Sequence, residues 1–325
     1  MKIGKSHYFK IGALAAFMIF AAAASVIFFP KILNPTIQTN KLLHVVLKIR
    51  LPQVLIAITA GGCLGLAGAL MQIILSNALA SPFTLGISSA SAFGASVAII
   101  IGLRGGTILF GAGLSAFIFA LASIALLLLI LSVAGISQRN IILIGMAVNF
   151  FFASANTLIK YYAPPDAVYQ IAFWTVGSLS GAKLTDSCVL SIILFVSLGI
   201  SLLYAKDFGL IRQGERTAIM HGVNVNAERI LFLLICSVLA AFPVAVVGII
   251  GFIGLVSPHI ARLLRLNSPK ELILSSAIIG SLFLVVSDII SKSILYPEVI
   301  PVGSVTSFLG IPTLLVLLFI MKGKR

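Results

Sequence analysis

The chain has 325 residues, of which 60% are hydrophobic and only 9% are charged. A soluble domain carries about 25% charged residues, so this composition excludes an ordinary soluble enzyme, a disordered chain and a nucleic-acid-binding domain. The formal net charge of +14 does not indicate a nucleic-acid partner, because the basic residues are spread between long apolar runs. With a mean hydropathy of +1.19, the chain is predicted to be an all-α polytopic membrane protein.

Ten apolar stretches approach or exceed the roughly 20 residues that a helix needs to cross a bilayer. In chain order they cover residues 11–29, 54–75, 84–103, 108–133, 141–160, 187–205, 230–250, 251–266, 272–290 and 304–321. The first stretch follows three lysines and resembles a signal peptide. Because it is long enough to span and no convincing cleavage site follows, we expect a retained first helix.

The third and eighth stretches are short, and each carries a Ser-Pro pair near its start, Ser81-Pro82 and Ser257-Pro258. A glycine-rich helix precedes each pair. With the N-terminus inside, the first pair lies near the inner face and the second near the outer face, which is the pattern of a weak inverted repeat. We expect one transmembrane domain over residues 1–325.

The basic residues favour an orientation with both termini in the cytoplasm. In a ten-span arrangement with the N-terminus inside, inner segments carry 14 of the 22 Lys and Arg residues and outer segments carry 8. This bias follows the positive-inside rule. Asp288 is an acid close to a predicted membrane boundary, and we expect it to cap a helix or to pair with Lys292, four residues on. A role in a transport path is the alternative.

The sequence lacks the motifs of several chemistries. No P-loop, H-E-x-x-H or G-x-S-x-G pattern occurs, and the four histidines are scattered, so we expect no catalytic residues, no metal site and no cofactor on this chain. An ion-coupled secondary carrier remains an alternative, although no pair of carboxylates lies within a span. An intramembrane enzyme is the other alternative, and it lacks a catalytic constellation.

The longest inner loop, residues 206–229, has seven charges in 24 residues. Residues 214–220 have the pattern of a short amphipathic helix, with Gly222 ending it. On the residues alone, this loop is either a solvated connector or a docking element for a cytosolic partner.

The stretch 248–264, GIIGFIGLVSPHIARLL, carries a specific motif. Its characteristic residues are Gly251, Phe252, Gly254, Pro258, His259 and Arg262. This motif resembles the signature of the permeases of ABC importers for iron–siderophore complexes, haem and cobalamin.

Six further segments resemble that family in order and spacing, so the resemblance extends over about residues 45–320. They are RLPQVLIAITAGGCLGLAGALMQ at 50–72, SNALASPFTLGISSASAFGA at 76–95, WTVGSLSG at 174–181, ERTAIMHGVNV at 215–225, SDIISK at 287–292 and IPVGSVTSFLGIPTLLVLL at 300–318.

The resemblance implies a ten-helix permease in a bacterial cytoplasmic membrane. Two permease chains, identical or different, would enclose a path for a ferric-siderophore, with haem or cobalamin as alternative ligands. Two cytosolic ATPase subunits would use the ATP, and an extracytoplasmic binding protein would deliver the ligand. This chain would be a transport subunit and not an enzyme, with lipid and not nucleic acid around it.

The resemblance also implies roles for individual residues. The ATPase coupling loop would include Arg212, Gln213, Glu215, Arg216, Ala218 and Gly222. Docking of the binding protein would use Arg50, Gln53 and Lys292, where the family has arginines; Gln53 is uncharged, and Lys292 lacks the bidentate fork of arginine. A wide path for a bulky ligand needs small polar groups. We expect Ser88, Ser89, Ser91 and Ser96 to line it or, alternatively, to hydrogen-bond between helices.

Overall fold

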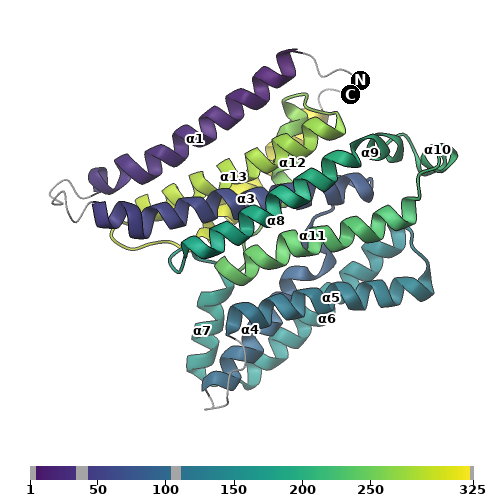
Figure 1. Cartoon of the computed structure of the whole chain (residues 1–325). Helices are drawn as coiled ribbons and strands as arrows, with labels where there is room; N and C mark the ends of the chain where they lie inside the picture. The colour runs from purple at the N-terminus through teal and green to yellow at the C-terminus, as the bar shows by residue number, and fades with distance from the viewer. Residues whose placement is uncertain (1–4, 34–42, 104–110, 323–325) are drawn as a thin grey trace. The chain divides into compact units, whose positions relative to one another are not determined.

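The computed structural model describes residues 5–33, 43–103 and 111–322, and all regular structure in these ranges is helical (Figure 1). A helix coincides with each of the ten predicted spans, although residues 108–110 lie outside the described ranges. These helices are α1 (Lys5–Leu33), α3 (Leu51–Ile74), α4 (Ile87–Leu103), α5 (Ala112–Ala134), α6 (Gln138–Tyr162), α8 (Leu184–Leu203), α11 (Val225–Val247), α12 (Ile253–Leu263), α13 (Pro269–Ser293) and α14 (Val302–Lys322).

Length and hydropathy agree with the prediction of a polytopic membrane protein. Among the described residues, seven helices are long and apolar enough to cross a membrane, and α4 and residues 302–316 of α14 are shorter apolar helices. The eighth predicted span, α12, has 11 residues. The all-α fold class is therefore confirmed.

Short elements connect the long helices within the described ranges. They are η1 (Val46–Arg50), η2 (Pro82–Leu85), α7 (Pro165–Thr175), α9 (Ala205–Ile211) and α10 (Glu215–Met220). The hydropathy pattern predicts no helix at α7, which starts at a Pro-Pro pair. Proline is favoured at the first position of a helix, because its missing N–H has no partner there in any case.

Polar side chains fix several helix starts. The Ser137 hydroxyl accepts from the backbone N of Asn140 at the start of α6, and Asn224 caps α11 in the same way. At α13, Ser268 and Glu271 form a capping box, in which each side chain accepts from the other residue's backbone N–H. These caps satisfy amide groups that have no partner within the helix.

The chain divides into two compact units, each described by itself. The first comprises residues 1–69, 178–202 and 250–325. Within it, α1 lies along α13, and both α12 and α14 pack against α13 (Figure 1). The second comprises residues 70–177 and 203–249. Within it, α4 packs against α5 and α6, and α11 packs against α5.

Glycines permit close helix contacts in the first unit. At Gly61 the backbone of α3 lies directly against that of α13, because a Cβ on Gly61 would lie 2.4 Å from the carbonyl oxygen of Gly280. A Cβ on Gly68 would lie 1.7 Å from the carbonyl oxygen of Gly254 in α12. Small residues let helix backbones approach in this way. The glycine-rich run that precedes the first Ser-Pro pair is therefore a packing surface.

The two Ser-Pro pairs differ in their local structure. Ser81 precedes the 3-10 turn η2, and Pro82 is the first residue of that turn, ahead of α4. Pro258 instead lies inside α12, where the Ser257 hydroxyl donates to the carbonyl of Ile253 at 2.7 Å. The expectation that each Ser-Pro pair stands near the start of its short stretch therefore holds only for the first, because α12 already begins at Ile253.

Candidate functional site: the coupling segment and the polar ends of α13

The loop 206–229 folds into two short helices, α9 and α10, ahead of α11. The predicted helix over residues 214–220 is confirmed, since α10 covers Glu215–Met220. Gly214 and Gly222 flank it with φ angles of +133° and +83°, backbone regions that favour glycine. We call residues 205–229 the coupling segment.

A charge pair holds α10 in place. Arg229, in the first two turns of α11, donates from Nη1 to Glu215 Oε1 at 3.1 Å and from Nη2 to Glu215 Oε2 at 2.8 Å. The Arg229 side chain has no exposed surface, whereas the Glu215 side chain is 44% exposed. The hydrogen bonds from Arg229 lower the pKa of Glu215 below its ordinary value. The bidentate geometry therefore fixes both the position and the charge of this carboxylate.

The remaining side chains of α10 divide into a buried and an exposed side. Ala218 is buried, while Ile219 and Met220 are 58% and 83% exposed. Arg216 is also exposed. Ile219 and Met220 form an exposed apolar tip on α10, and the basic side chain of Arg216 lies on the same helix. Such a surface is suited to contact with another protein.

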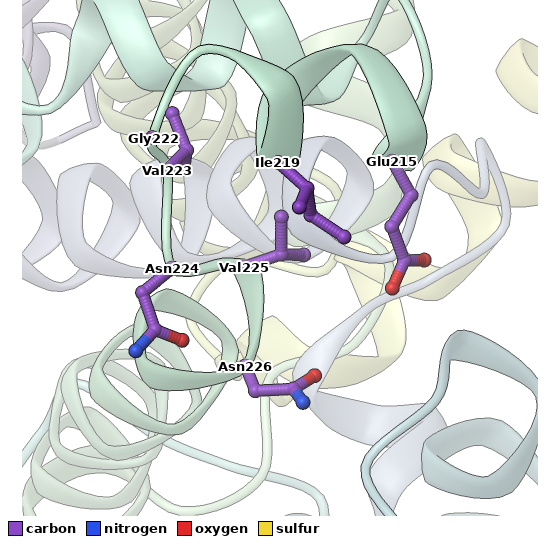
Figure 2. Close-up of a pocket in the computed structure, with 7 residues that line it drawn as sticks. All are labelled: Glu215, Ile219, Gly222, Val223, Asn224, Val225 and Asn226. Carbon is purple, nitrogen blue, oxygen red and sulfur yellow. The ribbon is translucent and has the colours of Figure 1, made fainter.

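A pocket of about 330 Å³ opens beside this tip (Figure 2). Its lining residues are Glu215, Ile219, Gly222, Val223, Asn224, Val225 and Asn226. Figure 2 shows the two asparagine side chains below the turn at Gly222, with Ile219 and Glu215 projecting from α10. Of the other predicted coupling residues, Arg212 and Gln213 are exposed on the turn between α9 and α10. The structure thus brings all six together on one segment.

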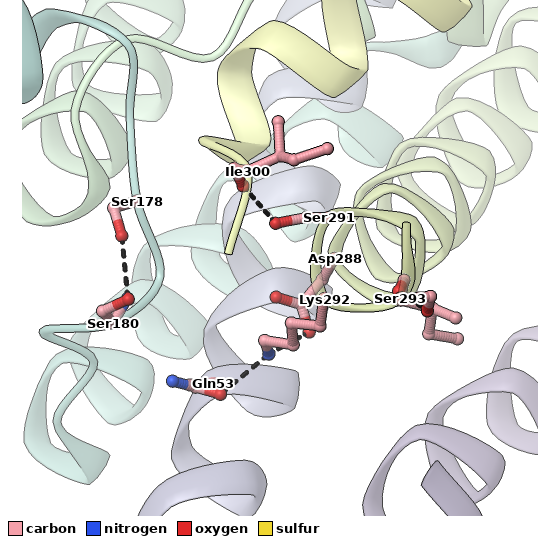
Figure 3. A network of polar contacts seen from close by, with 9 residues as sticks. Gln53, Ser178, Ser180, Asp288, Ser291, Lys292, Ser293 and Ile300 are labelled. Atoms are coloured by element: carbon pink, nitrogen blue, oxygen red, sulfur yellow. Dashed lines mark hydrogen bonds and ion pairs between the residues drawn. The ribbon is translucent and has the colours of Figure 1, made fainter. Parts of the chain in front are cut away.

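Two predicted docking residues lie in a buried polar network (Figure 3). Lys292 donates from Nζ to Gln53 Oε1 at 2.7 Å and to Asp288 Oδ2 at 2.5 Å. All three side chains are buried. The bond between Lys292 and Gln53 connects the end of α13 to the start of α3. The predicted pairing of Asp288 with Lys292 is confirmed. Arg50, the last residue of η1 and three positions before Gln53, is half-buried.

The opposite end of α13 carries a second polar contact. His7 Nδ1 lies 2.8 Å from Glu271 Oε1, and Lys10 Nζ donates to the carbonyl of Leu264 at 3.0 Å. These contacts fix the start of α1 to the α12–α13 corner. The sequence gives no sign of them, because His7 and Glu271 stand 264 positions apart.

The predicted path serines are mostly enclosed within α4. Ser88, Ser91 and Ser96 are buried, and Ser89 donates to the carbonyl of Gly86 at 3.0 Å. Ser96 donates to the carbonyl of Ala92 and to Asn156 Oδ1 of α6, at 2.8 Å and 2.7 Å. For Ser96 the structure therefore shows the alternative role, a hydrogen bond between helices.

The motif residues of 251–262 build the start of α12. Phe252 has a φ angle of +65° and stands directly before the helix, and a Cβ on Gly310 of α14 would lie 2.4 Å from the Phe252 Cβ. Pro258 and His259 are buried, with His259 Nδ1 2.8 Å from the carbonyl of Leu255. Gly251 and Arg262 are half-buried. The motif thus has a packing role, with Gly254 against α3.

A membrane chain whose described residues place a helix at each of ten apolar spans, with a short exposed helix ahead of α11, has the architecture of an ABC importer permease. A solved inward-facing structure, assigned to the metal-chelate type of ABC transporter, supports this class. It superposes with a TM-score of 0.84 at 26% identity, over 96% of this chain and 99% of that chain. The chain belongs to the FecCD transport family, whose model matches residues 10–320.

Two relatives illustrate the range of names within this similarity. A Helicobacter pylori protein, assigned as an iron chelatin transport system permease protein, is 35% identical over 288 residues, 88% of this chain and 86% of that protein. The hemin transport system permease protein of Yersinia pestis is 32% identical over 293 residues, 89% of this chain and 87% of that protein.

Sequence reasoning missed Arg229 and His7. A signal for Arg229 was present, because an arginine follows Glu228 inside the first turns of an apolar helix, where an unpaired charge is costly. Such a residue needs an acid, and Glu215 is one of few acids in the same loop.

Proposed function

We propose that this chain moves ferric-siderophore complexes across a bacterial cytoplasmic membrane as the permease subunit of an ABC importer, with separate subunits hydrolysing the ATP. The observation that carries the proposal is α10. It is a short helix with an exposed apolar tip, and a buried arginine holds its first residue by two hydrogen bonds. Such a rigid contact can transmit a movement from a partner into α11.

The proposal assigns the coupling segment to the cytoplasmic side, together with both chain termini. The excess of basic residues in the inner segments supports this orientation. Two ATPase subunits bind beneath a pair of permease chains, identical or different. The absence of a P-loop from the sequence supports a nucleotide site on those partners rather than here.

On the outer side we propose that Arg50 contacts an acidic residue of a substrate-binding protein. Arg50 is half-buried, whereas Gln53 and Lys292 are buried and bonded to each other. Gln53 and Lys292 are therefore suited to holding the α3 end that presents Arg50. The substitution Arg50→Glu is expected to weaken binding of that protein. The loss is expected to be larger at low ionic strength, where charge repulsion is less screened. Unchanged affinity at both salt concentrations would contradict this assignment.

The substrate follows from chemistry and from the named relatives together. Those relatives are named for iron chelatin and for hemin. The described part of the chain has no group of three His, Cys, Asp or Glu side chains placed to hold a metal. Iron would therefore pass as a complete chelate, without its ligands being exchanged for protein side chains. Among the four predicted path serines only Ser89 is half-buried, so it is the one that offers small polar surface on α4 to the proposed path, whereas Ser88 and Ser91 are buried.

The test is uptake of radiolabelled iron by iron-starved cells with and without this gene. A panel of ferric-siderophores is compared with haem and labelled cobalamin, before and after ATP depletion. Gene-dependent, ATP-dependent uptake of a ferric-siderophore is the expected result. Uptake of haem or cobalamin alone would replace the substrate and leave the transport class intact. Uptake that survives ATP depletion and collapses with the ion gradient would instead identify a secondary carrier.

A further inference from the structure

A second pocket lies beside the same turn of the coupling segment, at Gly222–Asn224, and two acidic residues line it. It has a volume of about 330 Å³. Its lining residues are Tyr204, Asp207, His221, Gly222, Val223, Asn224, Ala227, Glu228 and Leu231. Two carboxylates therefore face one small space, and no Lys or Arg is among the residues that line it. In a chain with a net charge of +14, this is an unusual local excess of negative charge.

Glu228 is the distinctive residue of this pocket. It is 6% exposed, and its Oε2 atom is buried without a hydrogen-bond partner. A carboxylate oxygen that is withdrawn from water and left unpaired costs free energy, and most such groups in proteins have a partner. Its neighbour Arg229 does not supply that partner: both Nη atoms of Arg229 bond to Glu215 on α10, and the Arg229 Nε atom is itself buried without a hydrogen-bond partner.

A helix cap and two ring contacts hold the walls of the pocket. Asn224 caps α11 by accepting from the backbone N of Ala227 at 3.1 Å. Tyr204 packs edge-on against Phe232 with ring centroids 5.4 Å apart, and Phe208 packs against the same ring at 4.7 Å. The carboxylates are thus held on a preformed aromatic and helical frame, which lowers the cost of binding a group between them.

We propose that this pocket receives a basic side chain of the ATPase subunit. Two carboxylates beside an aromatic ring match an arginine, whose planar guanidinium donates to several acceptors and stacks on aromatic rings. The inference rests on the proposed function. It adds a negatively charged site to a coupling contact in which Arg212 and Arg216 are positive. The ATPase would then be held at two chemically different points of the coupling segment.

The opposite signs give the contact a defined orientation. The ATPase surface must place an acidic side chain near Arg212 and Arg216 and a basic side chain in the pocket. If the ATPase bound in the reversed orientation, like charges would be brought together. The contact in the pocket should contribute more to orientation than the contact at Arg212 and Arg216, because Glu228 is buried and a partly desolvated charge interacts more strongly than an exposed one.

The experiment measures binding of the cognate ATPase subunit to the full chain in lipid nanodiscs, at low and high salt. Glu228→Gln keeps the shape of the side chain and removes the charge, and Asp207→Asn does the same at a half-exposed position. Each change is expected to raise the Kd about tenfold or more, and to reduce the salt dependence of binding. Asp166→Asn, in the first turn of α7, removes a carboxylate outside the pocket and is expected to leave the Kd unchanged.

Three outcomes separate the possibilities. If the unmodified chain binds the ATPase and the Glu228→Gln and Asp207→Asn variants lose affinity while the α7 control does not, the inference stands. If both variants bind with the affinity and salt dependence of the unmodified chain, the pocket has no basic occupant and the inference is wrong, although the proposed function survives. If the unmodified chain binds no ATPase subunit, the proposed function itself fails. The half-exposed Asp207 keeps the test valid should the buried substitution disturb folding.

Discussion

The contact between Arg229 and Glu215 holds α10 in the proposed coupling segment, and Glu215→Gln tests how much that contact contributes. The substitution preserves the shape of the side chain and removes the charge that accepts two hydrogen bonds from Arg229, at 3.1 Å and 2.8 Å. It leaves a guanidinium with no exposed surface facing a neutral amide. The six residues of α10 are too few to form a stable helix without this contact.

The magnitude follows from burial on the two sides. Breaking a fully buried pair costs about 3–5 kcal/mol, and breaking a solvent-exposed pair costs about 0.2–1 kcal/mol. One side chain here is fully enclosed and the other is 44% exposed, so an intermediate value applies. We expect Glu215→Gln to lower the free energy of opening α10 by about 1–3 kcal/mol. This corresponds to roughly 5- to 150-fold faster amide exchange in the segment.

The assay is hydrogen exchange on the full chain in nanodiscs, read at residues 215–223. The amides of Ala218, His221 and Val223 donate to backbone carbonyls within this turn and report its opening. Arg216→Gln is the matched control for the exchange measurement, because it removes a charge from the same helix without touching the contact. Substrate-stimulated ATP hydrolysis by the assembled transporter should fall together with the protection. Unchanged exchange at these amides in Glu215→Gln would refute the reasoning.

Three further predictions concern the pH dependence of the same contact and two other sites in the chain. Because Arg229 lowers the pKa of Glu215, the contact contributes its full stabilising free energy above the ordinary glutamate pKa of about 4.3 and loses it as pH falls through the lower folded pKa. Opening of α10, read from amide exchange, should therefore increase only in acid, and Glu215→Gln should abolish that dependence. Gly68→Ala would set a Cβ 1.7 Å from the Gly254 carbonyl oxygen and should prevent stable assembly of α3 with α12, as measured by thermal unfolding in detergent, whereas Gly199→Ala, with open space around it, should have little effect. Lys292→Met removes the Nζ that bonds Asp288 and should destabilise the chain by about 3 kcal/mol or more in the same assay; combining it with Asp288→Leu should recover most of the loss, and additive losses would contradict a buried pair.

The amino-acid sequence alone determined the class of protein and the positions of the ten helices that coincide with apolar spans, but not that of α7. Long apolar runs require intrahelical hydrogen bonds in a membrane, so hydropathy located a helix at each predicted span. Local spacing also sufficed for α10, bounded by Gly214 and Gly222, and for the Asp288–Lys292 pair, because residues four apart share one face of a helix.

The tertiary structure decided which charged groups are available to partners. Lys292 is basic and near a helix end, so its sequence position is compatible with an exposed docking residue. The fold instead buries it against Gln53, which stands 239 positions away. Glu215 and Arg229 are only 14 positions apart, but they lie on different helices. Their contact depends on the turn at Gly222 between α10 and α11. Periodicity reports which side of a helix a residue occupies, but pairing between helices depends on their packing, which no local pattern encodes.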